Sequence, residues 1–179
     1  MLRPYWTEFR RLAENAFAAY GVMILWVMTV ILEISVLAGQ PAFVGGMEPL
    51  SVSLQWMLAI PGVRSALMAR PGVLIFMGLV FAPLVEEAVF RMLPLALVEK
   101  WSKTQIHAVV IVVCGIVFGY AHGSPLNIFI QGFVGMMLGF LYLKNGPRQL
   151  SSYFSCVAVH ASYNFTMLAI SVAIGSHLH

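Results

Sequence analysis

The sequence has very little charge. Only 9% of its 179 residues are Asp, Glu, Lys or Arg, whereas a soluble domain carries about a quarter. Hydrophobic residues make up 60% of the chain. This balance excludes an ordinary soluble domain and predicts a protein that lies in a lipid bilayer. The net charge is only +3, and the basic residues form short clusters instead of a stripe, so nucleic acid is not an expected partner.

Several residue types and motifs that mark catalytic sites are also missing. The chain contains no aspartate, so a pair of catalytic aspartates is impossible. It has no His-Glu-x-x-His zinc signature and neither the Gly-x-Ser-x-Gly nor the Gly-x-Ser-Gly serine motif. Its two cysteines, Cys114 and Cys156, lie in apolar stretches without the spacing of metal ligands, and packing is their expected role.

Long hydrophobic runs are what the sequence has in abundance. A helix needs about 20 apolar residues to cross a hydrocarbon layer of about 30 Å. Five crossings are predicted on this criterion, at about 16–38, 72–98, 104–121, 126–143 and 153–175. A shorter apolar piece at 50–60 is predicted to be re-entrant or interfacial, which leaves a sixth crossing open. The predicted fold class is an all-α, polytopic membrane bundle of five to six helices.

The predicted organisation is a single integral-membrane domain over residues 1–179. Residues 1–15 mix aromatic and basic side chains, which is typical of an amphipathic segment at the membrane interface. The first apolar run is too long for the core of a cleaved signal peptide and is expected to remain as an anchor. With five crossings, most Lys and Arg residues fall on one side, and the positive-inside rule predicts a cytoplasmic N-terminus.

Two glycine pairs with four-residue spacing indicate how the helices meet. They are Gly115 with Gly119, and Gly135 with Gly139. Such spacing lets helix backbones approach closely in a membrane. We expect the third and fourth spans to pack centrally, although scattered glycines are also common in membrane helices.

Three charged residues lie inside the second predicted span: Glu86, Glu87 and Arg91. Each charge costs about 2.5 to 3.5 kcal/mol at the centre of a bilayer, so a functional reason is expected. Glu87 and Arg91 are four residues apart and can pair on one helix face, whereas Glu86 points about 100° away. A purely structural alternative is a buried ion pair, with Glu86 bonded to a neighbouring helix.

Further polar residues of catalytic type lie in two other spans. His122 ends the third span, while His160 and Asn164 share one face of the fifth. A symmetric turn between the second and third spans would bring Glu86 and His122 to similar depths. A carboxylate and an imidazole can activate water together, and a second imidazole and an amide can donate hydrogen bonds to an oxyanion. This set of groups is sufficient for hydrolysis of an amide.

The order of these groups forms three motifs across residues 86–164, nearly half of the chain. In this order the sequence resembles the CPBP (CAAX protease and bacteriocin-processing, or ABI) family of membrane endopeptidases. The motifs are Glu-Glu-x-x-x-Arg at Glu86, Glu87 and Arg91, Phe-x-x-x-His at Phe118 and His122, and His-x-x-x-Asn at His160 and Asn164. The motif-bearing core spans about 72–175.

The resemblance implies a division of labour among these residues. Glu86 would activate the attacking water with His122, while His160 and Asn164 stabilise the oxyanion, and the Glu-Arg pair beside Glu86 organises the site. No cofactor is expected, but two histidines and a glutamate could bind zinc, so zinc is not excluded. The expected location is a bacterial inner (plasma) membrane, which the predicted spans would cross several times.

The sequence therefore predicts an intramembrane endopeptidase that cleaves a membrane-associated protein or peptide. The family does not fix the substrate, because its members process prenylated tails or secreted peptides, or serve in bacteriocin immunity. The first alternative is a non-enzymatic immunity or scaffold protein in which the polar groups hold the helices together. A second alternative, a proton-linked carrier, is disfavoured because the chain is short and has no inverted repeat.

Overall fold

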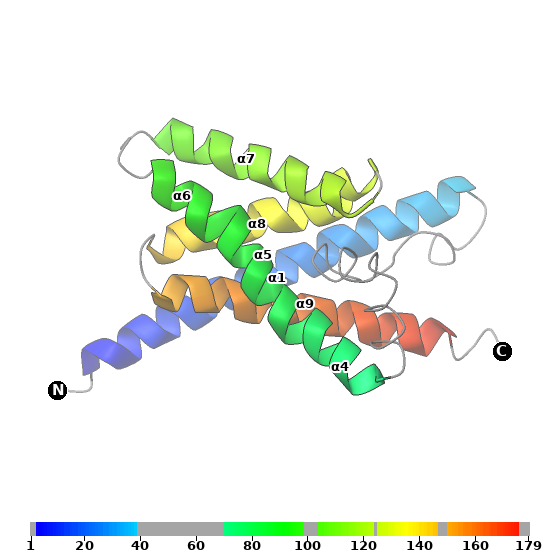
Figure 1. Cartoon of the computed structure of the whole chain (residues 1–179), viewed down its shortest axis with the longest axis horizontal. Coiled ribbons are helices and arrows are strands. Elements are labelled where there is room, and N and C mark those ends of the chain that lie inside the picture. Colours follow the sequence, from blue (N-terminus) through cyan, green and yellow to red (C-terminus); the bar gives the residue numbers. More distant parts are fainter. Residues whose placement is uncertain (1–2, 39–69, 99–103, 124, 147–149, 176–179) are drawn as a thin grey trace.

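The protein is a bundle of helices (Figure 1). The structure, a computed structural model, describes residues 3–38, 70–98, 104–123, 125–146 and 150–175. Every regular element within these ranges is helical, which confirms the predicted all-α class for this part of the chain. The predicted piece at 50–60 lies outside the described residues. The elements, in which η marks a π-helical stretch, are α1 (Arg3–Ala38), α4 (Pro71–Phe76), η2 (Met77–Phe81), α5 (Ala82–Glu87), η3 (Ala88–Met92), α6 (Leu93–Val98), α7 (Thr104–Ala121), η4 (Ile128–Gly132), α8 (Phe133–Asn145) and α9 (Leu150–Gly175).

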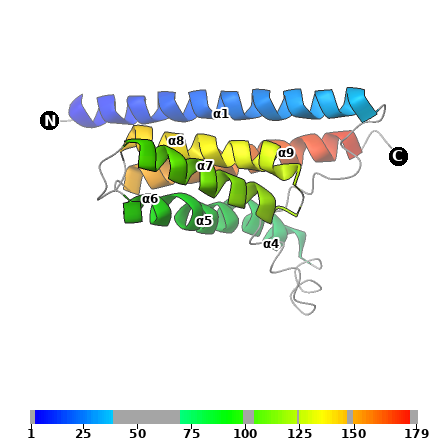
Figure 2. The ribbon, with the colours of Figure 1, turned by 90° about the horizontal axis from the view of Figure 1, so that it is seen from above.

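The helices are arranged in layers. Figure 2 shows α1 along one side of the bundle and the continuous helix from α4 to α6 along the opposite side. Between them, α8 and α9 contact each other, and both contact α1. In addition, α9 contacts η2 and α5, while α8 contacts η3. The two central helices therefore face the segment that carries the three buried charges.

The helix boundaries follow the predicted spans closely except at the N-terminus. The predicted third span coincides with α7, and the predicted second span forms the helix from α4 to α6. The first helix begins at Arg3, so the segment expected at the interface is helical and continuous with the first predicted span. At 1.5 Å per residue its 36 residues extend about 54 Å. This exceeds the ~30 Å hydrocarbon layer, so α1 must tilt or project beyond it.

Two helices in the described part of the chain are long and apolar enough to cross a membrane. They cover Thr7–Thr29 and Ile128–Asn145, and Gln105–Ala121 is a shorter apolar helix. By length and composition they fit the predicted bilayer location, but the number of five to six crossings stays a prediction.

Glycines allow α7 to contact the start of the fourth span backbone to backbone. A Cβ atom on Gly119 would lie 2.5 Å from the Asn127 carbonyl oxygen, and one on Gly115 would lie 2.9 Å from that of Gly132. The close approach predicted from the glycine spacing is therefore confirmed. The expected central position of α7 is wrong, because it lies on the outside of the bundle. Its outward side chains are apolar and exposed: Val109, Val113, Val117 and Tyr120.

The hydrophobic core lies where α1, α8 and α9 meet. Side chains of all three helices are almost completely buried there, among them Met23, Val27, Val134, Leu138 and Cys156. Because this core fixes α9 against α8, it also sets the position of polar residues on their other faces.

The helix from α4 to α6 contains two π-helical stretches, each followed by a proline. The first, η2, ends at Phe81 and the second, η3, ends at Met92, and Pro83 and Pro94 come two residues later. Proline lacks an N–H group and its ring displaces the carbonyl four residues earlier, so the hydrogen-bond register must change near it. Single π turns of this kind are frequent at functional sites.

Candidate active site

Glu86, Glu87 and Arg91 are buried side chains on α5 and η3. Their exposed fractions are 2%, 0% and 2%. The guanidinium Nη1 of Arg91 lies 3.1 Å from Oε1 of Glu87, so the ion pair predicted from the four-residue spacing is confirmed. Because these side chains are almost completely buried, their charges must be compensated by protein partners.

Arg91 is held by two other helices as well. Its Nε donates a hydrogen bond to the Gly135 carbonyl on α8 at 3.3 Å. Its guanidinium carbon lies 4.3 Å from the centre of the Phe118 ring on α7, a cation–π contact. A Cβ on Gly135 would lie 2.6 Å from Nη2 of Arg91. Glycine at this position therefore provides the space that the guanidinium occupies.

His160 on α9 connects the two glutamates. It is 3% exposed, its Nδ1 lies 2.7 Å from Oε1 of Glu87, and its Nε2 lies 3.6 Å from Oε2 of Glu86. An ionised carboxylate only accepts hydrogen bonds, so with Glu87 ionised Nδ1 carries the proton in this contact. Nε2 is thereby directed toward Glu86. We refer to Glu86, Glu87, Arg91 and His160 as the buried ionic cluster.

His122 lies just after α7 and contacts the cluster through Phe118. The Nδ1 atom of His122 lies 2.7 Å from the Phe118 carbonyl oxygen, and the two rings meet edge to face with centroids 4.6 Å apart. The Phe118 ring also lies 5.9 Å from the His160 ring, again edge to face. Since a carbonyl can only accept, Nδ1 donates, and neutral His122 presents Nε2 as an acceptor.

Asn164 lies one turn beyond His160 on α9. Its Nδ2 donates to the Gly78 carbonyl in η2 at 3.0 Å. A side-chain amide has two N–H donors, so this bond orients the group and uses one of them. The second donor is available to another acceptor.

The structure thus joins four predicted site residues directly in the buried ionic cluster. It places His122 beside the cluster through one shared aromatic ring, and it fixes Asn164 against η2. Sequence reasoning missed the role of Gly135 as the cradle of Arg91. It also missed Tyr153, whose hydroxyl donates to the Leu84 carbonyl at 2.7 Å, two residues before Glu86. The glycine spacing marked Gly135 as a helix contact, but only the position of α8 shows what it contacts.

The described residues contain no group of three or more His, Cys, Asp or Glu side chains arranged to hold a metal ion. One oxygen of Glu87 already contacts both Arg91 and His160. The Glu87 carboxylate therefore already binds two donor side chains of the protein through this oxygen.

Comparison with known families adds an independent observation. The family described as type II CAAX prenyl endopeptidase Rce1-like has a model that matches residues 69–166, more than half of the chain. The chain belongs to this family. The resemblance predicted from the three motifs is confirmed, and the matched range contains every residue of the predicted site. No curated protein and no solved structure matches the chain.

Membership of the Rce1-like family identifies the protein as a membrane-embedded protease of the CAAX type. This accords with the exposed apolar face of α7. A protease requires a peptide or protein substrate, so the predicted class of partner is supported at that level.

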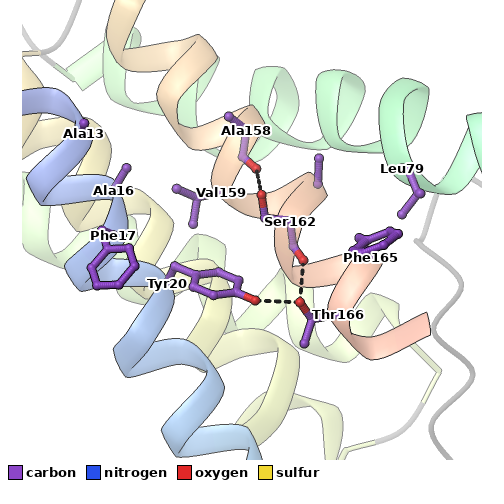
Figure 3. A pocket seen from close by; sticks show the side chains of 11 residues that line it. Ala13, Ala16, Phe17, Tyr20, Leu79, Ala158, Val159, Ser162, Phe165 and Thr166 are labelled. Atoms are coloured by element: carbon purple, nitrogen blue, oxygen red, sulfur yellow. Dashed lines mark hydrogen bonds between the residues drawn. The ribbon is translucent and has the colours of Figure 1, made fainter. Parts of the chain in front are cut away.

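A groove of about 830 Å³ lies between α1, η2 and α9 (Figure 3). Its hydroxyl groups are satisfied within the protein, since Tyr20 bonds to Thr166 and Ser162 donates to the Ala158 carbonyl. Ser162 lies two residues from both His160 and Asn164, which places it about 160° away from each around α9. The groove therefore lies on the opposite face of α9 from the candidate active-site residues of this Rce1-like protein.

Gly135→Ala is expected to displace the Arg91 guanidinium. The added Cβ would also lie 3.0 Å from the Phe118 ring, so both neighbours must move. Overpacking of this kind costs about 1 to 3 kcal/mol, which thermal unfolding in detergent measures. Gly21→Ala is the matched control, because nothing lies within 4 Å of a Cβ there and alanine favours the helix. Equal stability of the two variants would contradict the cradle.

Proposed function

We propose that this protein is a glutamate-dependent intramembrane endopeptidase that hydrolyses a peptide bond in a membrane-associated protein or peptide. The supporting observation is the position of His160, which lies 2.7 Å from one buried glutamate and 3.6 Å from the other. A buried imidazole between two carboxylates provides proton acceptors and donors in a site removed from bulk solvent. In a protein of the Rce1-like family, the amide bond of a peptide is the bond that these groups would hydrolyse.

The reaction assigned to this site begins with a water molecule at Glu86. The Glu86 carboxylate removes a proton as the water oxygen attacks the carbonyl carbon of the substrate. The carbonyl oxygen becomes an oxyanion in a tetrahedral intermediate. When the carbon–nitrogen bond breaks, the proton passes from Glu86 to the leaving amine. The products are a carboxylic acid and an amine, and the acid then gives its proton to the amine, so that they leave as a carboxylate and an ammonium.

The remaining residues have distinct proposed roles. His122 presents Nε2 as an acceptor and shares the orientation of the water. The second N–H of Asn164 donates to the oxyanion, as does Nε2 of His160 in its imidazolium form, in which both ring nitrogens donate. Glu87 fixes the ring of His160, and Arg91 neutralises Glu87.

The proposal includes a metal-free mechanism. It is supported by Glu87, whose Oε1 contacts the guanidinium of Arg91 and the imidazole of His160. A strong chelator is expected to leave the cleavage rate unchanged. Inactivation by the chelator that added zinc reverses would contradict this part of the proposal.

The proposed setting is a single membrane domain over residues 1–179 with its motif-bearing core at about 72–175. We further propose a multi-pass arrangement in a bacterial plasma membrane with the N-terminus in the cytoplasm. The exposed apolar side chains of α7 support a lipid-facing surface, and the distribution of Lys and Arg supports the orientation.

His160→Ala is expected to lower the cleavage rate at least about 100-fold, because it removes a proposed oxyanion donor. The assay uses proteoliposomes, a library of membrane-anchored peptides and water enriched in ¹⁸O, with products mapped by mass spectrometry. The wild type should give one ¹⁸O atom in each new carboxyl group. Ser162→Ala is the matched control on the opposite face of α9, where the hydroxyl bonds only within the helix.

Two results would contradict the endopeptidase. One is a folded wild type that yields no labelled product from the library. The other is a folded His160→Ala protein that cleaves as fast as the control. If the variant instead loses abundance without any separable loss of cleavage, the polar cluster serves as a scaffold.

A further inference from the structure

The Gly78 carbonyl lacks its normal partner within the helix. In an α-helix it would accept from the N–H of Ala82. That N–H instead bonds to the Met77 carbonyl, which is the π-helical register of η2. A π-helical bond to Gly78 would need the N–H of residue 83, but residue 83 is proline and has none.

Asn164, on α9, donates a hydrogen bond to this carbonyl in place of the missing backbone N–H. Its Nδ2 lies 3.0 Å from the Gly78 oxygen. Pro83 is buried, as are the two glutamates that follow it on α5. Gly78 itself is half-buried, and a carbonyl shielded from solvent is costly to leave without a partner, so the amide of Asn164 is held to this acceptor. One N–H is thereby fixed, which also fixes the direction of the other.

We infer that Pro83 is a positioning residue that orients the Asn164 amide for catalysis by leaving the Gly78 carbonyl unpaired within its own helix. This inference rests on the proposed function, in which the second N–H of Asn164 donates to the oxyanion. A donor of this kind must be held before the reaction, since preorganisation is what makes it effective. The proline and the π turn together create the acceptor that holds it.

The same helix contains an internal comparison. At η3 the N–H of Leu93 bonds to the Ala88 carbonyl, and Pro94 follows, so Val89 is left in the position that Gly78 has in η2. Val89 is exposed, and Asn164 bonds at η2. Pro94→Ala therefore removes a proline of the same helix in the same local setting without touching the acceptor of Asn164.

Pro83→Ala supplies the missing N–H. The helix can then return to the α register, in which Ala82 donates to Gly78 and residue 83 donates to Leu79. Asn164 loses its acceptor and its amide is no longer oriented. We expect kcat to fall about 10- to 100-fold with KM changed less than about twofold, because orientation and not uniform binding is lost.

A double-mutant cycle separates this effect from general damage to the helix. If Pro83 acts through Asn164, the double variant Pro83→Ala/Asn164→Ala should be no slower than Asn164→Ala alone. The pair Pro94→Ala and Asn164→Ala should instead be additive. Additive losses for Pro83 and Asn164 would overturn the inference.

A spectroscopic measurement tests the hydrogen bond without any substrate. Gly78–Leu79 is the only Gly-Leu pair in the sequence, so ¹³C-carbonyl glycine with ¹⁵N-leucine gives one correlated NMR signal for the Gly78 carbonyl. Asn164→Ala should shift this carbon resonance to lower frequency when it is introduced into the wild-type protein or into the Pro94→Ala variant. In Pro83→Ala the same substitution should leave it in place. An equal shift in the Pro83→Ala background would overturn the inference.

The two measurements also distinguish a failure of the inference from a failure of the proposed function. If the wild type cleaves peptides but the kinetic losses are additive, Pro83 has no positioning role and the endopeptidase stands. The opposite result is a wild type that cleaves nothing while the effect of Asn164→Ala on the Gly78 carbonyl resonance depends on Pro83. In that case Pro83 fixes the Asn164 amide, but its catalytic purpose is refuted together with the proposed function.

Discussion

Glu86→Gln is expected to lower kcat by about 10²- to 10⁴-fold, the range that general acid–base catalysis contributes. Glutamine keeps the size of the side chain and its ability to accept a hydrogen bond, but it cannot take a proton from water. Glu86 is buried, with Oε2 at 3.6 Å from Nε2 of His160, so no bulk solvent replaces it as a base. KM should change little, because the substitution removes a step in the reaction and not a binding contact.

The matched control for this substitution is Glu14→Gln. This substitution removes the same charge at an exposed position, where Glu14 pairs with Arg10 at 2.8 Å. Initial rates in proteoliposomes and unfolding temperatures in detergent should be measured for both variants. A folded Glu86→Gln enzyme that cleaves at the wild-type rate would refute the assignment of Glu86 as the base.

Arg91→Met is expected to destabilise the protein by about 3 to 5 kcal/mol, because it leaves the buried Glu87 carboxylate without its ion-pair partner. Methionine retains an apolar side chain beside Phe118, so the loss is mainly electrostatic. A change of this size corresponds to a fall in unfolding temperature on the order of 10 °C for a chain of this length. Thermal unfolding in detergent measures it.

A second substitution shows whether the lost charge is the cause. Arg91→Met combined with Glu87→Gln removes both charges of the pair, and the glutamine oxygen can still accept from Nδ1 of His160. Part of the stability should return, since a neutral replacement of a buried pair is often tolerated. Arg10→Met disrupts only an exposed pair and should cost no more than about 1 kcal/mol. If the double variant is less stable than Arg91→Met alone, the ion pair is not the source of the effect.

The pairing within the buried cluster illustrates what sequence spacing can establish. Two residues four positions apart in a helix lie on the same face. The contact between Glu87 and Arg91 was therefore predictable from the helix period alone. The link from His160 to Glu87 required more, because it joins residues 73 positions apart on two helices. Helical period fixes which face a side chain lies on, but not which helix that face meets.

The arrangement of the helices shows the same division. The bounds of the third span predicted from its apolar run are those of the observed helix, Thr104–Ala121, because hydrophobic length decides where a helix forms in lipid. The glycine spacing predicted a close approach, yet α7 lies outside while α8 and α9 are central. A small residue permits contact between two helices without specifying how many other helices surround them.

By itself the sequence determined the helical class, the main helix boundaries, the family and the residues from which the candidate site is built. These follow from local period, hydrophobic length and motif order, all of which are properties of neighbouring positions in the chain. Only the tertiary structure decided that His160 bridges Glu86 and Glu87, and that Asn164 binds a carbonyl freed beside Pro83. Such contacts depend on the rotation and depth of packed helices, which distant core residues set together.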